Sequence, residues 1–104
     1  MKIVQDKVKN FIKNNNLETN AENHFIDLVS EIGEVGKELL KMSNYGRNKS
    51  IEFREEIKGE LGDAFYSLIS VANKFNVDLE LELNKVLKKY EKRLQKGSAG
   101  SEND

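Results

Sequence analysis

The fold is decided by the stretch Leu28-Val29-Ser30-Glu31-Ile32-Gly33-Glu34-Val35-Gly36-Lys37-Glu38-Leu39. Its apolar side chains recur every three or four residues, which is the period of an amphipathic helix. Two carboxylates, Glu31 and Glu34, lie three residues apart and therefore share one side of that helix. They flank the apolar stripe, so the stretch predicts a packed helix that carries a carboxylate pair on its shoulder.

A second stretch, Glu60-Leu61-Gly62-Asp63, repeats this design later in the chain. Glu60 and Asp63 stand at nearly the same angular offset from their own apolar stripe. If the two helices pack antiparallel, four carboxylates converge, and they repel one another unless a hard cation lies between them. Oxygen ligands without cysteine favour Mg²⁺, with Mn²⁺ as the alternative. The competing interpretation is an ordinary solvated helix face, because charged shoulders are normal on amphipathic helices.

Glycines stand beside both carboxylate pairs. Gly33, Gly36 and Gly62 lie in the middle of predicted helices, where each costs about 1 kcal/mol relative to alanine. Helices keep such glycines for close packing or for space beside a ligand. The only histidine, His24, is not spaced for the Glu-x-x-His pairs of a di-iron bundle.

Composition indicates one small all-α domain. The 104 residues carry a net charge of −1, no cysteine and no proline. The neutral balance argues against a nucleic-acid partner, and no apolar run suggests a signal peptide or a membrane span. We therefore expect a cytoplasmic protein with a domain over residues 1–96. The Gly/Ser-rich residues 97–104 are expected to form a flexible tail.

Four helices are predicted, arranged as a bundle with short connections. Their approximate bounds are Lys2–Asn15, Ala21–Ser43, Ile51–Phe75 and Leu79–Lys96. Thr19 or Asn20, Ser50 and Asp78 are the candidate N-caps of the last three. Asn44 to Asn48, with Gly46 at its centre, is the clearest loop. The expected core positions are Val4, Val8, Phe11, Ile12, Phe25, Leu28, Ile32, Val35, Leu39, Phe53, Ile57, Leu61, Ala64, Leu68, Ala72, Leu79, Leu83, Val86, Tyr90 and Leu94.

Taken together, the two carboxylate stretches resemble the MazG-like nucleotide pyrophosphohydrolases of the all-α NTP pyrophosphatase superfamily. The similarity covers most of the chain and includes residues 28–39, residues 60–69, Ala72-Asn73 and residues 77–80. It implies a four-helix MazG-like bundle completed by homo-oligomerisation, as a homodimer or homotetramer. It also implies Mg²⁺-dependent hydrolysis of a nucleoside triphosphate to the monophosphate and pyrophosphate.

By this resemblance, Glu31, Glu34, Glu60 and Asp63 are the metal ligands. Glu31 or Glu34 orients the attacking water, and the sequence does not choose between them. Two departures from the family pattern stand out. Ser30 occupies a position where many members have a glutamate, and this departure bears on a second metal ion or on a particular water-activating carboxylate. Members that act on deoxycytidine-type nucleotides often lack that glutamate too. Lys89 stands near a position where many members have asparagine.

Substrate phosphates also need cations, and the last predicted helix offers candidates in Lys85, Lys89 and Arg93. A solvated helix face is the alternative for these three, and the one that the sequence favours. His24, two turns before Glu31, is a candidate base contact, although solvent or a helix-terminus contact is favoured. Two rival functions stay open at this point. One is a non-catalytic helical interaction module of the same fold, and the other is a superfamily enzyme acting on phosphoribosyl-ATP.

Overall fold

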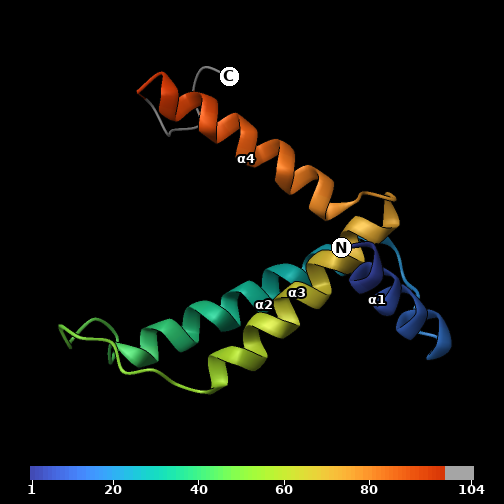
Figure 1. Ribbon diagram of the computed structural model, residues 1–104. Helices are drawn as coiled ribbons and strands as arrows, with labels where there is room; N and C mark the ends of the chain where they lie inside the picture. The colour runs from blue at the N-terminus through green and yellow to red at the C-terminus, as the bar shows by residue number, and fades with distance from the viewer. Residues whose placement is uncertain (98–104) are drawn as a thin grey trace.

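The computed structural model describes residues 1–97 and confirms an all-α chain. It contains α1 (Lys2–Asn14), α2 (Ala21–Met42), α3 (Glu56–Lys74) and α4 (Leu79–Gln95) (Figure 1). Within residues 1–97 there is no strand. The flexible tail expected at residues 97–104 lies, apart from Gly97, outside the described residues.

Two of the predicted N-caps are confirmed by hydrogen bonds. The Asn20 side chain accepts from the backbone N–H of Asn23 at 2.8 Å at the start of α2. The Asp78 side chain accepts from the backbone N–H of Leu81 at 3.1 Å at the start of α4. Each bond satisfies one of the backbone donors that a helix leaves unpaired at its first turn.

The predicted start of the third helix is wrong. α3 begins at Glu56 rather than Ile51, and Ser50 does not cap it. The backbone N–H of Glu52 donates to the carbonyl of Met42 at 3.0 Å, which ties this segment to the end of α2. Tertiary contacts therefore override the helical pattern of residues 51–55. The predicted loop before it is confirmed, with left-handed backbone at Asn44, Tyr45 and Gly46.

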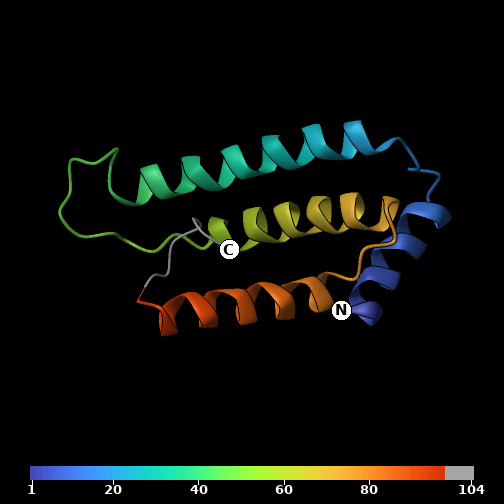
Figure 2. The same ribbon diagram turned by 90° about the horizontal axis from the view of Figure 1, so that it is seen from above.

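The helices form an antiparallel pair with two additions. α2 and α3 pack along their length, and α1 packs across α3 (Figure 2). The rings of Phe11 and Tyr66 meet edge to face at 6.2 Å in the α1–α3 contact. α4 diverges from the α2–α3 pair at a wide angle (Figure 1). The two carboxylate stretches thus lie on the paired helices, and α4 projects away from them.

The buried side chain of Gln5 connects α1 to the segment between α3 and α4. The amide nitrogen of Gln5 on α1 donates to Asn73 Oδ1 at 3.0 Å and to the carbonyl of Val77 at 2.8 Å. Its amide oxygen accepts from the backbone N–H of Leu79 at 2.9 Å. Because a buried amide must be paired, these bonds hold α1, the end of α3 and the start of α4 together.

The predicted apolar stripes are only partly buried in the single chain. Ile12 and Ala72 are buried as expected, and Ile69 is the most enclosed large side chain. Many other stripe positions are exposed: Val4, Phe11, Phe25, Ile32, Leu39, Phe53, Leu61, Leu68, Leu83, Tyr90 and Leu94. None of the helices in residues 1–97 is long and apolar enough to cross a membrane.

Candidate functional site

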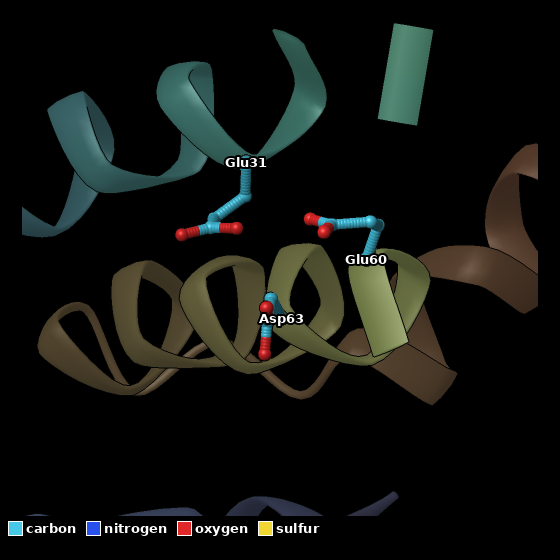
Figure 3. Close-up of side chains that lie close together, drawn as sticks. All are labelled: Glu31, Glu60 and Asp63. Carbon is cyan, nitrogen blue, oxygen red and sulfur yellow. The ribbon is translucent and has the colours of Figure 1, made fainter. Parts of the chain in front are cut away.

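The antiparallel pairing of α2 and α3 brings the two carboxylate stretches together. Glu31 on α2 and Glu60 and Asp63 on α3 each offer an oxygen, and these three atoms lie within 4.8 Å of one another. Figure 3 shows Glu31 directed toward α3 and Glu60 directed back toward α2, with Asp63 one turn away on α3. We call these three residues the carboxylate cluster. Glu31 and Glu60 are half-buried, whereas Asp63 is exposed.

Glu34, the fourth predicted ligand, lies at the margin of this arrangement. Its side chain is exposed, and it is not one of the three residues whose oxygens meet. Its charge nevertheless acts on Glu60, whose pKa it helps to raise. The structure therefore assembles three of the four predicted carboxylates and leaves Glu34 beside them.

The electrostatics of the cluster favour a cation. The pKa of Glu60 is raised above its ordinary value of 4.5, first by burial and then by the charges of Glu34, Asp63, Glu31 and Glu38. A divalent ion between the carboxylates would remove this repulsion. The donors are all carboxylate oxygens and Asp63 is exposed to solvent, which fits Mg²⁺ or Mn²⁺ with water completing the coordination.

The glycines beside the carboxylates leave open space. A Cβ atom added at Gly33, Gly36 or Gly62 would meet nothing within 4 Å. Close packing inside the chain is therefore not the reason for these glycines. The alternative, room for a ligand or for another chain, remains compatible with this open surface.

Two residues of this region were missed at the level of sequence. The Arg54 Nε donates to Glu38 Oε1 at 2.7 Å, and Glu38 is 7% exposed. This hydrogen bond is the first cause that holds the pKa of Glu38 below its ordinary value. Glu38 stands seven residues after Glu31 and so shares its side of α2, a spacing that was available in the sequence. Arg54 gives no such signal, because it falls in the first turn of the helix that the sequence predicts over Ile51–Phe75.

The predicted cations lie on α4. Lys85 pairs with Glu82 at 3.2 Å, and the Lys89 ammonium lies 5.5 Å from the ring centre of Tyr90. Arg93 is buried and lies 5.3 Å from the same ring. Because α4 diverges from α2 and α3 (Figure 1), the structure does not bring these side chains to the carboxylate cluster of the same chain.

His24 is buried, so the solvent position favoured from the sequence is wrong. Its pKa is lowered from 6.5, first by burial and then by the charge of Lys74. The imidazole lines a cavity of about 180 Å³ between α1, α2 and α3, with Ile12, Ser70 and Asn73 among its neighbours. Residues of α1 and α3 line the same cavity and account for the burial of His24, which the amphipathic pattern of α2 alone did not reveal.

Comparisons with known proteins give the family of the chain. The MazG nucleotide pyrophosphohydrolase domain matches residues 20–98, a range that contains both carboxylate stretches. The solved structure of the Bacillus-conserved MazG protein, a nucleotide pyrophosphohydrolase, is similar with a TM-score of 0.70. The two chains are 29% identical, and the match covers 86% of each. No curated protein sequence matches the chain. The match over residues 20–98 and the shared fold show that the chain belongs to the MazG nucleotide pyrophosphohydrolase family.

Proposed function

We propose that the protein is a Mg²⁺-dependent pyrophosphohydrolase that converts a nucleoside triphosphate to the monophosphate and pyrophosphate. The observation that carries this proposal is the carboxylate cluster, which joins Glu31 to Glu60 and Asp63 across the α2–α3 pair. Both stretches that supply it lie within the family match. The all-oxygen donor set suits the cation that accompanies a triphosphate.

The four carboxylates would have different roles, which follow from their positions. Glu31, Glu60 and Asp63 would hold Mg²⁺, which neutralises phosphate charge and acidifies water when bound. Glu34 is exposed beside them and is the carboxylate free to orient a water against the α-phosphorus. In that step a new oxygen–phosphorus bond forms at the α-phosphorus and the bond to the bridging oxygen of the β-phosphate breaks. The proton of the water passes to the Glu34 carboxylate and pyrophosphate leaves.

We further propose that the chain works as a homodimer or homotetramer. Its accessible surface is 8017 Å², whereas a compact monomer of 11.9 kDa would expose roughly 5,900 Å². The radius of gyration is 17.1 Å, against roughly 13 Å for a compact chain of this length. The excess of roughly 2,000 Å² per chain is enough for an obligate interface between copies.

This assembly bears on the α4 cations. Lys85 and Lys89 project from a helix that diverges from the carboxylate cluster of its own chain (Figure 1). Any contact between them and substrate phosphates therefore requires the cluster of a second copy. The same assembly would cover apolar side chains that the single chain leaves exposed on α2, α3 and α4, including Ile32, Leu61 and Leu83.

The decisive experiment measures pyrophosphate release over a panel of ribo- and deoxynucleoside triphosphates with Mg²⁺, alongside thermal melts with and without the ion. We expect release from at least one nucleotide and a higher melting temperature with Mg²⁺. Asp63→Asn should abolish both responses, and Glu91→Gln, at an exposed carboxylate on α4, should change neither. A wild-type chain that is stabilised by no divalent ion and cleaves no nucleotide would refute the enzyme and favour an interaction module.

A further inference from the structure

An ion pair near the carboxylate cluster joins the end of α2 to the start of α3. Arg54 Nε lies 2.7 Å from Glu38 Oε1, and Arg54 Nη2 lies 3.3 Å from Glu56 Oε2. Lys41 Nζ lies 3.7 Å from the other oxygen of Glu38. Across the part of the chain that the structure describes, the bond from Arg54 to Glu38 is the only side-chain hydrogen bond that links α2 to α3 or to the residues leading into it.

The burial of Glu38 distinguishes this pair from the surface ion pairs of the chain. The Glu38 side chain is 9% exposed, whereas both side chains of the Lys58–Glu55 pair are more than two-thirds exposed. Exposed ion pairs add little to folding stability, because water screens the two charges and both side chains lose conformational freedom when they pair. A buried carboxylate, in contrast, needs its partner, because an unpaired charge in that position is strongly unfavourable.

The backbone connects Arg54 directly to the first turn of α3. The carbonyl of Arg54 accepts from the N–H of Ile57 at 3.2 Å, and the carbonyl of Glu55 accepts from the N–H of Lys58 at 3.0 Å. Glu60 follows within the next turn. At the other end, Glu38 lies two helical turns beyond Glu31 on the same side of α2. The pair therefore sets where α3 starts relative to the side of α2 that carries Glu31.

The carboxylate cluster depends on this register. A slip of one residue along an α-helix moves a side chain by about 1.5 Å along the axis and about 100° around it. Such a slip would carry Glu60 away from Glu31, although their oxygens must stay within the 4.8 Å that the cluster spans. The bond from Arg54 to Glu38 ties the residues that lead into α3 to the side of α2 that carries Glu31, and it therefore opposes such a slip.

We infer that Arg54 is a positioning residue for the metal centre, acting through its ion pair with Glu38 to hold Glu60 opposite Glu31. The inference rests on the proposed function, since it assumes that the carboxylate cluster binds a divalent cation. It does not require that Arg54 touch the metal or the substrate.

The direction of the effect separates positioning from simple electrostatics. Removing a positive charge near the acidic cluster makes the site more negative, which by itself tightens binding of a cation. Loss of the register between α2 and α3 would instead weaken binding of the cation. Arg54→Ala should therefore weaken binding if Arg54 positions the ligands, and should strengthen it if the arginine contributes only charge.

The test is a Mn²⁺ titration followed by electron paramagnetic resonance, with each variant held at a temperature where circular dichroism shows intact helices. We expect Arg54→Ala to bind Mn²⁺ about tenfold more weakly than wild type, the lower end of the loss for residues that orient metal ligands. The matched control is Arg47→Ala, which removes the same charge from the same segment between α2 and α3. Within residues 1–97 the Arg47 guanidinium forms no ion pair. The affinity of this control variant should equal or exceed that of wild type.

Two further variants keep the test decisive if Arg54→Ala loses its helices. Arg54→Glu should bind Mn²⁺ weakly, and the exchanged pair Glu38→Arg with Arg54→Glu should restore binding toward wild type. Binding by Arg54→Ala as tight as in Arg47→Ala, or failure of the exchanged pair to recover, would overturn the positioning role. A wild-type protein that binds no Mn²⁺ would instead overturn the metal centre and this inference with it.

Discussion

Glu31 of α2 and Glu60 of α3 face each other across the helix pair, with carboxylate oxygens that lie within 4.8 Å. Within residues 1–97 neither carboxylate accepts a hydrogen bond or pairs with a cation, so their charges oppose each other directly. Burial raises the pKa of Glu60, and the surrounding carboxylates raise it further. The site is thus arranged at a cost in stability that a bound cation would offset.

The first prediction concerns Glu60→Gln in the absence of metal. Because the pKa of Glu60 in the folded chain lies above 4.5, the ionised form opposes folding at neutral pH. The amide should therefore raise the metal-free melting temperature at pH 7 by a few degrees. This advantage should shrink as the pH falls through the raised pKa of folded Glu60, and it should vanish below pH 4.5, where Glu60 becomes protonated in both the folded and the unfolded state. Thermal melts in chelator, from pH 7 to below pH 4.5, measure it.

Glu38→Gln provides the contrast for that experiment. The Arg54 hydrogen bond lowers the pKa of Glu38 below 4.5, so ionised Glu38 favours folding at pH values above 4.5. Its replacement should lower the melting temperature at pH 7, and the difference should fade only as the pH falls below 4.5. If both amides moved the melting temperature in the same direction at pH 7, the electrostatic account of the cluster would fail.

The sequence predicted the helices well because local signals determine them. The caps Asn20 and Asp78 are residue types that bond to the first turn of a helix. The start of α3 could not be read in this way, since residues 52–54 are held by contacts with α2 rather than by their own propensity. Helix spacing likewise placed the three residues of the cluster on facing sides. It could not show that Glu34 stays outside, because that depends on the rotation of each helix in the packed pair.

A second prediction separates water activation from metal binding. Glu34 is exposed and lies outside the group of three oxygens. Glu34→Gln should therefore retain Mn²⁺ binding within a few-fold of wild type while slowing pyrophosphate release about 10²-fold, the loss typical of a general base. Glu31→Gln should lose both. Metal titration and pyrophosphate release on the same preparations decide the assignment. Loss of metal binding in Glu34→Gln equal to that in Glu31→Gln would make Glu34 a ligand rather than a base.

A third prediction uses the single histidine of the chain. Burial and the charge of Lys74 lower the pKa of His24, so its imidazole resonances should titrate with a midpoint below 6.5 in nuclear magnetic resonance spectra. Lys74→Ala removes one cause and should raise the midpoint. Because the folded chain binds this proton less readily than the unfolded chain, His24 should also lower stability as the pH falls below 6.5. A midpoint at or above 6.5 would mean that α1 does not cover His24 in solution.

The last prediction concerns the surface between α3 and the start of α4. An apolar hollow there is lined by Phe65 and Leu68 of α3 and by Leu79, Leu83 and Val86 of α4, and Leu83 is 54% exposed. Covering one leucine at an interface contributes about 2 kcal/mol, and a carboxylate placed there would also lose hydration. If the chain works as the proposed homodimer or homotetramer, Leu83→Glu should therefore dissociate that assembly, whereas wild type should sediment as the oligomer. Leu17→Glu, at an exposed leucine between α1 and α2, should sediment as wild type does. Sedimentation velocity with circular dichroism on the same samples distinguishes dissociation from unfolding. A monomeric wild-type chain would show that the exposed apolar faces of α3 and α4 are not covered by a second copy.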